Sequence, residues 1–307
     1  MAKIEHELQS RPFQLRNQIN HQSKRKYSFL FKCVCLISAL LLGVVLLAII
    51  IFIGKTGLLV FKDVSITEFF FSTVWEPYEE KFGAAIFIIG TIILTVLTML
   101  FAVPLSLTMA IFIVEIAPEW FKRILRPVLD LLVGIPSIIY GYLGLTILIP
   151  ILRDLTGSIM GDGILAASLV LTLMVLPTIT RISDDALSAV PSQLREASYA
   201  LGSTRLQTVF KIILPAAKPG ILTAIILGMA RALGETMAVV MVIGNTAQLP
   251  SDLLTPTSVL TSNIVMQILD VQYESTWNYA LYMMAFLLLM ISMFMILLIR
   301  RIRTSGV

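Results

Sequence analysis

The sequence predicts an all-α membrane protein of about six transmembrane helices, each formed by an apolar run of roughly 20 residues. Of the 307 residues, 57% are hydrophobic and 14% are charged, whereas soluble domains carry about 25% charged residues. The mean hydropathy is +0.91. The net charge of +4 comes from basic residues at the ends of the apolar runs, which indicates orientation in a membrane rather than nucleic-acid binding.

The first two apolar runs differ in length. The first covers residues 28–53 after a polar tail, residues 1–27. It is longer than a signal-peptide core, so we expect a retained transmembrane helix followed by an outer loop over residues 54–82. The second run extends from residue 83 to about residue 115 and contains Pro104. Proline disfavours a helix interior, so we expect either one long tilted helix or two helices.

Four further runs predict the remaining transmembrane helices. Gly134 and Pro136 interrupt the first of these four runs. The runs cover residues 127–152, 164–180, 214–244 and 279–299.

Lysine and arginine residues predict the orientation of the chain. They cluster in the N-terminal tail, in the loop after the second run and at the C-terminus, where Arg300 precedes the C-terminal tail, residues 301–307, and Arg301 and Arg303 lie in it. The loop of residues 245–278 contains none. The positive-inside rule therefore places both termini in the cytoplasm, which requires an even number of transmembrane helices.

Cysteines and histidines predict no disulfide and no metal site. Cys33 and Cys35 lie inside the first apolar run, where cysteine serves as a small apolar side chain. His6 and His21 lie in the polar tail with no third ligand nearby.

The longest inner loop, residues 181–213, contains a predicted amphipathic helix. Pro191 suits a first helical turn and Gly202 suits a left-handed helix end. The side chains that share one face at helical spacing are those of Leu194, Ala197, Ala200 and Leu201. Such a helix either docks into a groove on another protein or lies at the lipid interface.

Two charged residues lie within the fifth apolar run. Arg231 and Glu235 are four residues apart, so a continuous helix would place them on one face and within reach of each other. A charge in the bilayer centre costs about 2.5–3.5 kcal/mol on insertion scales. The couple is therefore either a mutual ion pair or a gate or binding point for an anion, because arginine offers a planar fork of donors to an oxyanion.

Other charged residues predict local roles. We expect Asp130 to pair with Arg126 one helical turn earlier. For Arg181, Asp184 and Asp185 we expect a solvated charged face.

The inner loop resembles the EAA motif of ABC importer permeases, Glu-Ala-Ala, three residues, Gly, nine residues, Ile-x-Leu-Pro. Every spacing fits, and the one departure is Ser198 in place of the second alanine. The resemblance implies a permease core over residues 83–300. It also implies that the loop is a coupling segment seated in a cleft of a separate ATPase subunit. Its motif residues are Glu196, Ala197, Ser198, Gly202, Ile212, Leu214 and Pro215.

ATP hydrolysis is not expected in this chain. Gly54-Lys55-Thr56 resembles the end of a Walker A loop, but Ile49 occupies the position of the first glycine. The triplet also follows an apolar run rather than a soluble strand. We therefore expect no cofactor bound by this chain, with ATP and magnesium used by the partner ATPase.

The fifth run more narrowly resembles the phosphate-specific ABC permeases, in particular the PstC family. The segment from Arg231 through Gly-Glu-Thr-Met-Ala to Gly244-Asn245 carries this resemblance, together with Gly134-Ile-Pro-Ser-Ile-Ile-Tyr-Gly141. The resemblance implies a type I, MetI-like permease of the bacterial inner membrane that translocates phosphate. Its pathway residues are then Arg231, Glu235 and Thr236.

Partners follow from the same resemblance. They are a second, PstA-like permease subunit in a heterodimer, a cytoplasmic PstB-like ATPase dimer and a periplasmic PstS-like phosphate-binding protein. The alternatives are a permease for sulfate, molybdate or another small solute, an ion-gradient-driven transporter, and a phosphate-sensing signalling subunit. The ion-gradient alternative leaves the EAA-like loop unexplained.

Overall fold

The computed structural model describes residues 31–304. The predictions for the tail of residues 1–27, including His6 and His21, lie outside the described residues. The chain divides into two units, Met1–Lys55 and Thr56–Val307. In the first unit the described residues form one apolar helix that contains the free thiols of Cys33 and Cys35.

The first membrane-spanning helix begins at Phe31 in the described part of the chain, and the candidate span runs to Lys62. Its last turn is the 3-10 helix η1 (Leu58–Lys62). The triplet Gly54-Lys55-Thr56 is helical. It therefore lacks the loop conformation with which a Walker A segment surrounds phosphates.

Short elements join the first and second spans. Ser65 caps the helix α2, because its side chain accepts a hydrogen bond from the Glu68 amide. The two strands pair antiparallel with Trp75 opposite Phe82, and the Trp75 ring packs edge-on against Phe82 and Phe87. These elements are α2 (Ile66–Phe71), β1 (Trp75–Glu76), η2 (Pro77–Glu79) and β2 (Lys81–Phe82).

The second span is one continuous helix. It comprises α3 (Ala85–Ile111) and the π-helical turn η3 (Phe112–Ile116). Pro104 lies inside α3 without ending it. Transmembrane helices tolerate such prolines where neighbouring helices support the backbone, and α3 packs along α7.

The region predicted as the third span divides at Pro136. The helix α4 (Glu119–Gly134) begins upstream of the predicted start and carries charged residues along one face. Ile135 is extended, as expected before proline. The candidate span then runs over Ser137–Thr156. It comprises α5 (Ser137–Leu143), the π-helical turn η4 (Gly144–Leu148) and α6 (Ile149–Thr156).

The helix α7 (Ile164–Ser188) continues eight residues beyond the predicted end of the fourth run at residue 180. The elements after it form the inner loop and the fifth span. They are α8 (Ser192–Ala200), α9 (Arg205–Thr208), the π-helical turn η5 (Val209–Ile213) and α10 (Leu214–Gly234).

The fifth run is also broken, because α10 ends at Gly234 and a new helix starts at Met237. A parallel bridge between Gly244 and Thr257 joins the segments that follow. The last elements are α11 (Met237–Val242), α12 (Leu260–Gln267) and α13 (Thr276–Thr304).

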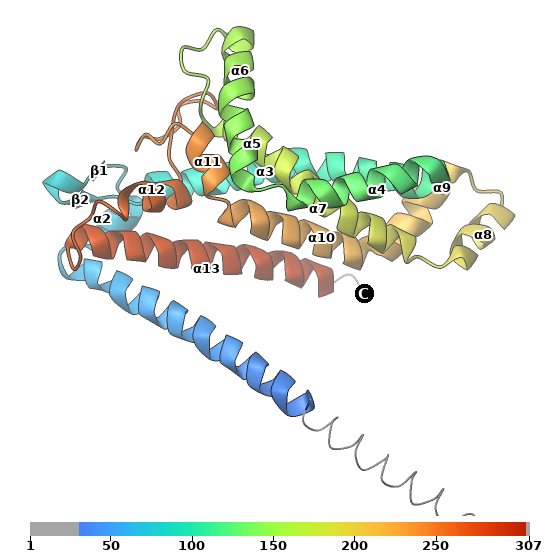
Figure 1. Cartoon of the computed structure of the whole chain (residues 1–307), viewed down its shortest axis with the longest axis horizontal. Helices are drawn as coiled ribbons and strands as arrows, with labels where there is room; N and C mark the ends of the chain where they lie inside the picture. Colours follow the sequence, from blue (N-terminus) through green and yellow to red (C-terminus); the bar gives the residue numbers. More distant parts are fainter. Residues whose placement is uncertain (1–30, 305–307) are drawn as a thin grey trace, which may run out of the picture. The chain divides into compact units, whose positions relative to one another are not determined.

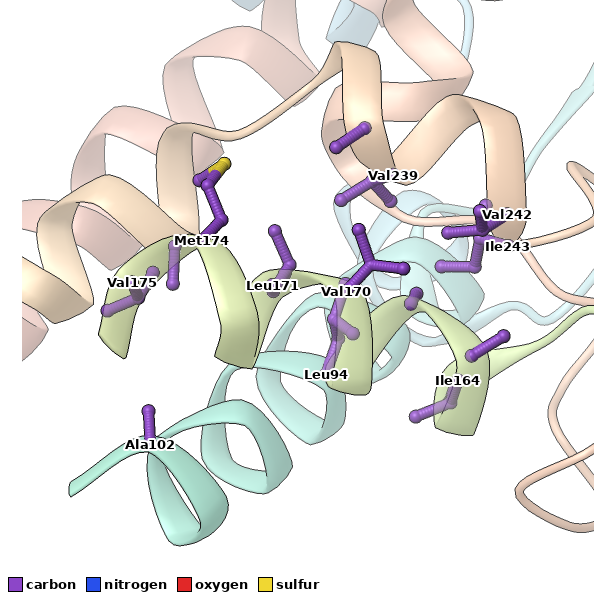
Figure 2. Packing of buried hydrophobic residues seen from close by; sticks show 14 of the residues in the cluster. Leu94, Ala102, Ile164, Val170, Leu171, Met174, Val175, Val239, Val242 and Ile243 are labelled. Carbon is purple, nitrogen blue, oxygen red and sulfur yellow. The ribbon is translucent and has the colours of Figure 1, made fainter. Parts of the chain in front are cut away.

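The helix α7 is the centre of the second unit. It contacts α3, α4 and α10 (Figure 1). Figure 2 shows Val170 and Leu171 of α7 packed between Leu94 of α3 and Val239 of α11. Six helices are long and apolar enough to cross a membrane, which confirms the predicted class and number.

Candidate functional site

Arg231, in the last turn of α10, joins three helices. Its Nη1 donates a 2.9 Å hydrogen bond to the Thr178 hydroxyl of α7. Its Nη2 donates to the Val133 carbonyl at 3.4 Å, in the last turn of α4, where carbonyls have no partner within the helix. A guanidinium has five N–H donors. Among the described residues, two of these N–H donors have protein partners and three have none.

Glu235 does not share a helix face with Arg231, so that prediction was wrong. The helix α10 ends at Gly234, and Glu235 is extended at φ −73° and ψ 127°. Its carboxylate accepts a 3.2 Å hydrogen bond from the Ala238 amide at the start of α11. In the described part of the chain no ion pair joins Arg231 and Glu235. The carboxylate therefore caps the next helix instead of neutralising the arginine.

Thr236 lies in the break between the two helices. Its hydroxyl donates to the Gly234 carbonyl at 3.3 Å, and the Thr261 hydroxyl of α12 donates to the Glu235 carbonyl at 3.3 Å. Arg231, Glu235 and Thr236 are all partly exposed. The break thus exposes polar backbone and side chains within an otherwise apolar span, which is tolerated where the chain lines a cavity or is buried in protein.

Glycines bring the helices of this region close together. A Cβ on Gly228 of α10 would lie 2.5 Å from Ile179 Cγ1 of α7. A Cβ on Gly141 of α5 would lie 2.9 Å from the Ala238 Cα of α11. Tight packing therefore holds both sides of the break.

An ion-pair network joins α4 and α7. Arg126 donates Nε and Nη2 to the two Asp184 oxygens, each at 2.8 Å. Arg181 contacts Asp130 at 3.0 Å, Asp184 at 3.3 Å and Asp185 at 2.6 Å. The predicted Arg126–Asp130 pair was wrong, because Arg126 reaches across to α7.

The Asp184 side chain is completely buried, so the predicted solvated face was wrong for this residue. Its hydrogen bonds raise the pKa of Arg126 above the usual value. A buried carboxylate is stable only with such charged partners. The network therefore fastens α4, whose last turn also holds Arg231, to α7.

The EAA-like loop folds as two short helices around a left-handed turn. Gly202 has φ +80°, which glycine adopts without steric cost. Thr204 and Gln207 form a capping box at α9. Ser198, the departure from the motif, is buried and hydrogen-bonds with the Thr208 hydroxyl at 2.9 Å.

The predicted apolar face of α8 is uncovered in this chain. Leu194 and Leu201 are 43% and 87% exposed, and Glu196 and Ala197 are also exposed. The motif continues through the π-helical turn η5 into α10. In that part Ile212 and Leu214 are half-buried and Pro215 is exposed.

Solved structures share this fold. A subunit of the MetNI methionine ABC transporter in an inward-facing conformation matches with a TM-score of 0.57 and 24% identity, covering 71% of this chain and 93% of that chain. A chain of a bacterial ABC transporter that imports alginate matches with a TM-score of 0.62 and 15% identity, covering 88% and 95%. These likenesses concern the fold, which is that of MetI-type ABC permeases.

Several proteins are more similar to this chain in sequence than these solved structures are. The Bacillus subtilis (strain 168) protein named probable ABC transporter permease protein YqgH is 47% identical over 266 residues, covering 85% of this chain and 86% of that protein. The Xylella fastidiosa (strain 9a5c) phosphate transport system permease protein PstC is 36% identical over 301 residues, covering 91% and 90%. A probable PstC of Methanocaldococcus jannaschii is 36% identical over 220 residues, covering 65% and 70%.

A family model ties the fold and these relatives together. Residues 102–305 match the model described as binding-protein-dependent transport system inner membrane component. The matched region includes α7, the EAA-like loop and the Arg231 segment. The chain therefore belongs to the family of binding-protein-dependent transport system inner membrane components, multi-pass permeases of ABC transporters, and within it groups with the PstC permeases.

Proposed function

We propose that this chain is a permease subunit of an ATP-driven importer that translocates inorganic phosphate across the bacterial inner membrane. The observation that carries the proposal is Arg231, a guanidinium at membrane depth with three N–H donors left free of protein partners in the described structure. A planar fork of donors matches the oxygens of a tetrahedral oxyanion. The PstC relatives, whose names specify phosphate transport, support phosphate as that anion.

The Arg231 environment suits passage rather than tight storage. Its two protein partners are an uncharged hydroxyl and a carbonyl, so its charge is not cancelled by a carboxylate at the same place. Glu235 and Thr236, at the adjoining helix break, complete the proposed pathway. Polar groups at a broken helix near the membrane centre are a recurrent way to bind and release a solute.

The partners in this proposal follow from the uncovered surfaces and the family. A PstA-like permease completes the pore, and a periplasmic PstS-like protein delivers phosphate. A cytoplasmic PstB-like ATPase dimer binds ATP and magnesium and docks on α8, whose exposed residues include Leu194 and Glu196. Both termini are then cytoplasmic, which agrees with the positions of the basic residues.

Uptake by the complete importer tests the proposal. In proteoliposomes containing all partners, we expect ATP-dependent uptake of labelled phosphate that excess unlabelled phosphate abolishes and equal sulfate or molybdate does not. Arg231→Gln should lower uptake by at least about tenfold, the effect of losing roughly 1.4 kcal/mol of anion interaction. Arg123→Gln is the matched control, because Arg123 is an exposed arginine of α4.

Two results would contradict the proposal. Equal competition by sulfate or molybdate would remove phosphate as the specific solute. Normal uptake by Arg231→Gln at equal expression would remove Arg231 from the pathway.

A further inference from the structure

One side chain of α8, that of Arg195, contacts two membrane-spanning segments. Arg195 donates Nη1 to the Val190 carbonyl at 2.7 Å and Nη2 to the Leu187 carbonyl at 2.9 Å. The Leu187 carbonyl lies in the last turn of α7 and the Val190 carbonyl two residues beyond its end, where backbone acceptors lack α-helical partners. A positive charge at this end also interacts favourably with the helix dipole.

The same guanidinium reaches the second span. Arg195 Nη2 lies 3.1 Å from Glu115 Oε1, and Nε donates to the same oxygen at 3.2 Å. Glu115 belongs to the π-helical turn η3 at the end of α3. Its side chain is 8% exposed and that of Arg195 is 20% exposed, so neither charge can be hydrated fully if the other is removed.

Arg195 and its neighbour Glu196 point in different directions from α8. Successive helical residues are rotated by about 100°, so Arg195 points into the permease while Glu196 is exposed. A partner that displaces the exposed face therefore pulls on α7 and α3 through Arg195.

Hydroxyl–carbonyl hydrogen bonds also join α7 to α3. Ser106 donates to the Leu176 carbonyl at 3.2 Å, and Thr180 donates to the Ser106 carbonyl at 3.4 Å. The helix α7 also carries Thr178, which holds Arg231. A continuous chain of contacts thus leads from α8 to the proposed pathway.

We propose that Arg195 is the positioning residue that converts displacement of α8 by the ATPase into a joint movement of α7 and α3. This inference rests on the proposed function and assigns a role to Arg195 and Glu115, which lie outside the matched positions of the EAA-like motif. Arg195 touches no solute. It transmits force by fixing three segments to one planar group.

The first test measures phosphate imported per ATP hydrolysed in proteoliposomes. A purely structural role would change the amount of assembled importer but not this ratio. We expect Arg195→Gln and Glu115→Gln each to lower the ratio by roughly tenfold, within the usual range of coupling between sites. The double variant should fall no further, because the two residues form one interaction.

Two further variants serve as controls for this test. Arg195→Lys keeps the charge opposite Glu115 but not the planar fork, so its ratio should lie between those of the wild type and Arg195→Gln. Arg123→Gln should leave the ratio unchanged. An unchanged ratio in Arg195→Gln, a wild-type ratio in Arg195→Lys, or multiplied effects in the double variant would overturn the inference.

A second test needs no solute. Cys33 and Cys35 are first replaced by serine. Cysteines are then introduced at the exposed residues Ser192 of α8 and Ile116 of η3. Spin labels attached to these two cysteines report the distance between α8 and η3. We expect one narrow distance distribution, with and without nucleotide, that becomes broad in Arg195→Gln. Equally narrow distributions in both proteins would overturn the link. Absence of phosphate uptake by the wild type would contradict the proposed function alone, since this distance would still be measurable.

Discussion

Arg231 of α10 and Thr178 of α7 are joined by a 2.9 Å hydrogen bond between two neighbouring helices. The hydroxyl fixes the direction of the guanidinium without cancelling its charge. Hydrogen bonds to charged groups contribute about 1.5–3 kcal/mol, and both side chains are partly exposed, so the lower end applies. Thr178→Val should therefore weaken phosphate transport about tenfold, measured as uptake rate against phosphate concentration.

Thr178→Ser is the matched control for this prediction. It retains the hydroxyl that accepts from Arg231 and should transport like the wild type. If valine and serine were equally active, the hydrogen bond would have no part in transport.

Glu235 provides a test of its role as a cap. Its Oε1 accepts from the Ala238 amide at 3.2 Å, and glutamine offers a carbonyl oxygen of the same geometry. Glu235→Gln should therefore keep the stability of the wild type, whereas Glu235→Ala should lose about 1 kcal/mol, the usual cost of removing a helix cap. Thermal unfolding of the purified protein in detergent measures the difference. Equal midpoints for the glutamine and alanine variants would exclude the capping role.

The Arg126–Asp184 pair predicts that substituting Arg126 lowers the free energy of unfolding more than substituting the nearby Arg123. Removing one partner of a buried ion pair costs about 3–5 kcal/mol. We expect about 2 kcal/mol for Arg126→Gln, because the Arg126 side chain is 37% exposed and Arg181 still contacts Asp184. Arg123→Gln should be nearly neutral. Comparable losses in unfolding temperature for both variants would show that Asp184 does not depend on Arg126.

Gly134 and Gly141 should differ in how well they tolerate substitution by alanine. A Cβ on Gly141 would lie 2.9 Å from the Ala238 backbone, while a Cβ on Gly134 meets nothing within 4 Å. Gly141→Ala must separate α5 from α11 and should cost about 1–3 kcal/mol. Gly134→Ala should be neutral or slightly stabilising. Unfolding midpoints measure both, and a stable Gly141→Ala protein with normal uptake would contradict the close approach.

Hydropathy predicted the spans because lipid imposes a strong, local requirement on composition. The helix of the EAA-like loop could also be predicted, because its ends depend on local residues. Pro191 and Gly202 flank α8, as expected from their backbone preferences. The sequence did not show whether the long second run forms one helix or two, since Pro104 is compatible with both. Packing of α3 on α7 decides it in favour of one helix.

The errors concern features that depend on distant residues. Arg231 and Glu235 lie at helical spacing, so nothing local distinguished a continuous helix from one that ends at Gly234. Asp184 resembled a surface residue because its partner Arg126 is 58 positions away. Thr178 is a polar residue within an apolar run, which only weakly indicates a functional role. Its contact with Arg231 could be recognised only in the three-dimensional structure.

The π-helical turn η5 has a consequence for the angular phase of the fifth span. A π turn holds one residue more than an α turn, which offsets all later side chains by about 100°. Because η5 (Val209–Ile213) directly precedes α10, the angular position of α10 depends on whether this turn is wound as a π-helix or as an α-helix. If all residues of η5 were kept and rewound as α-helix, Arg231 would rotate by about 100° and point away from α7. Deleting one residue together with the π turn would restore its direction.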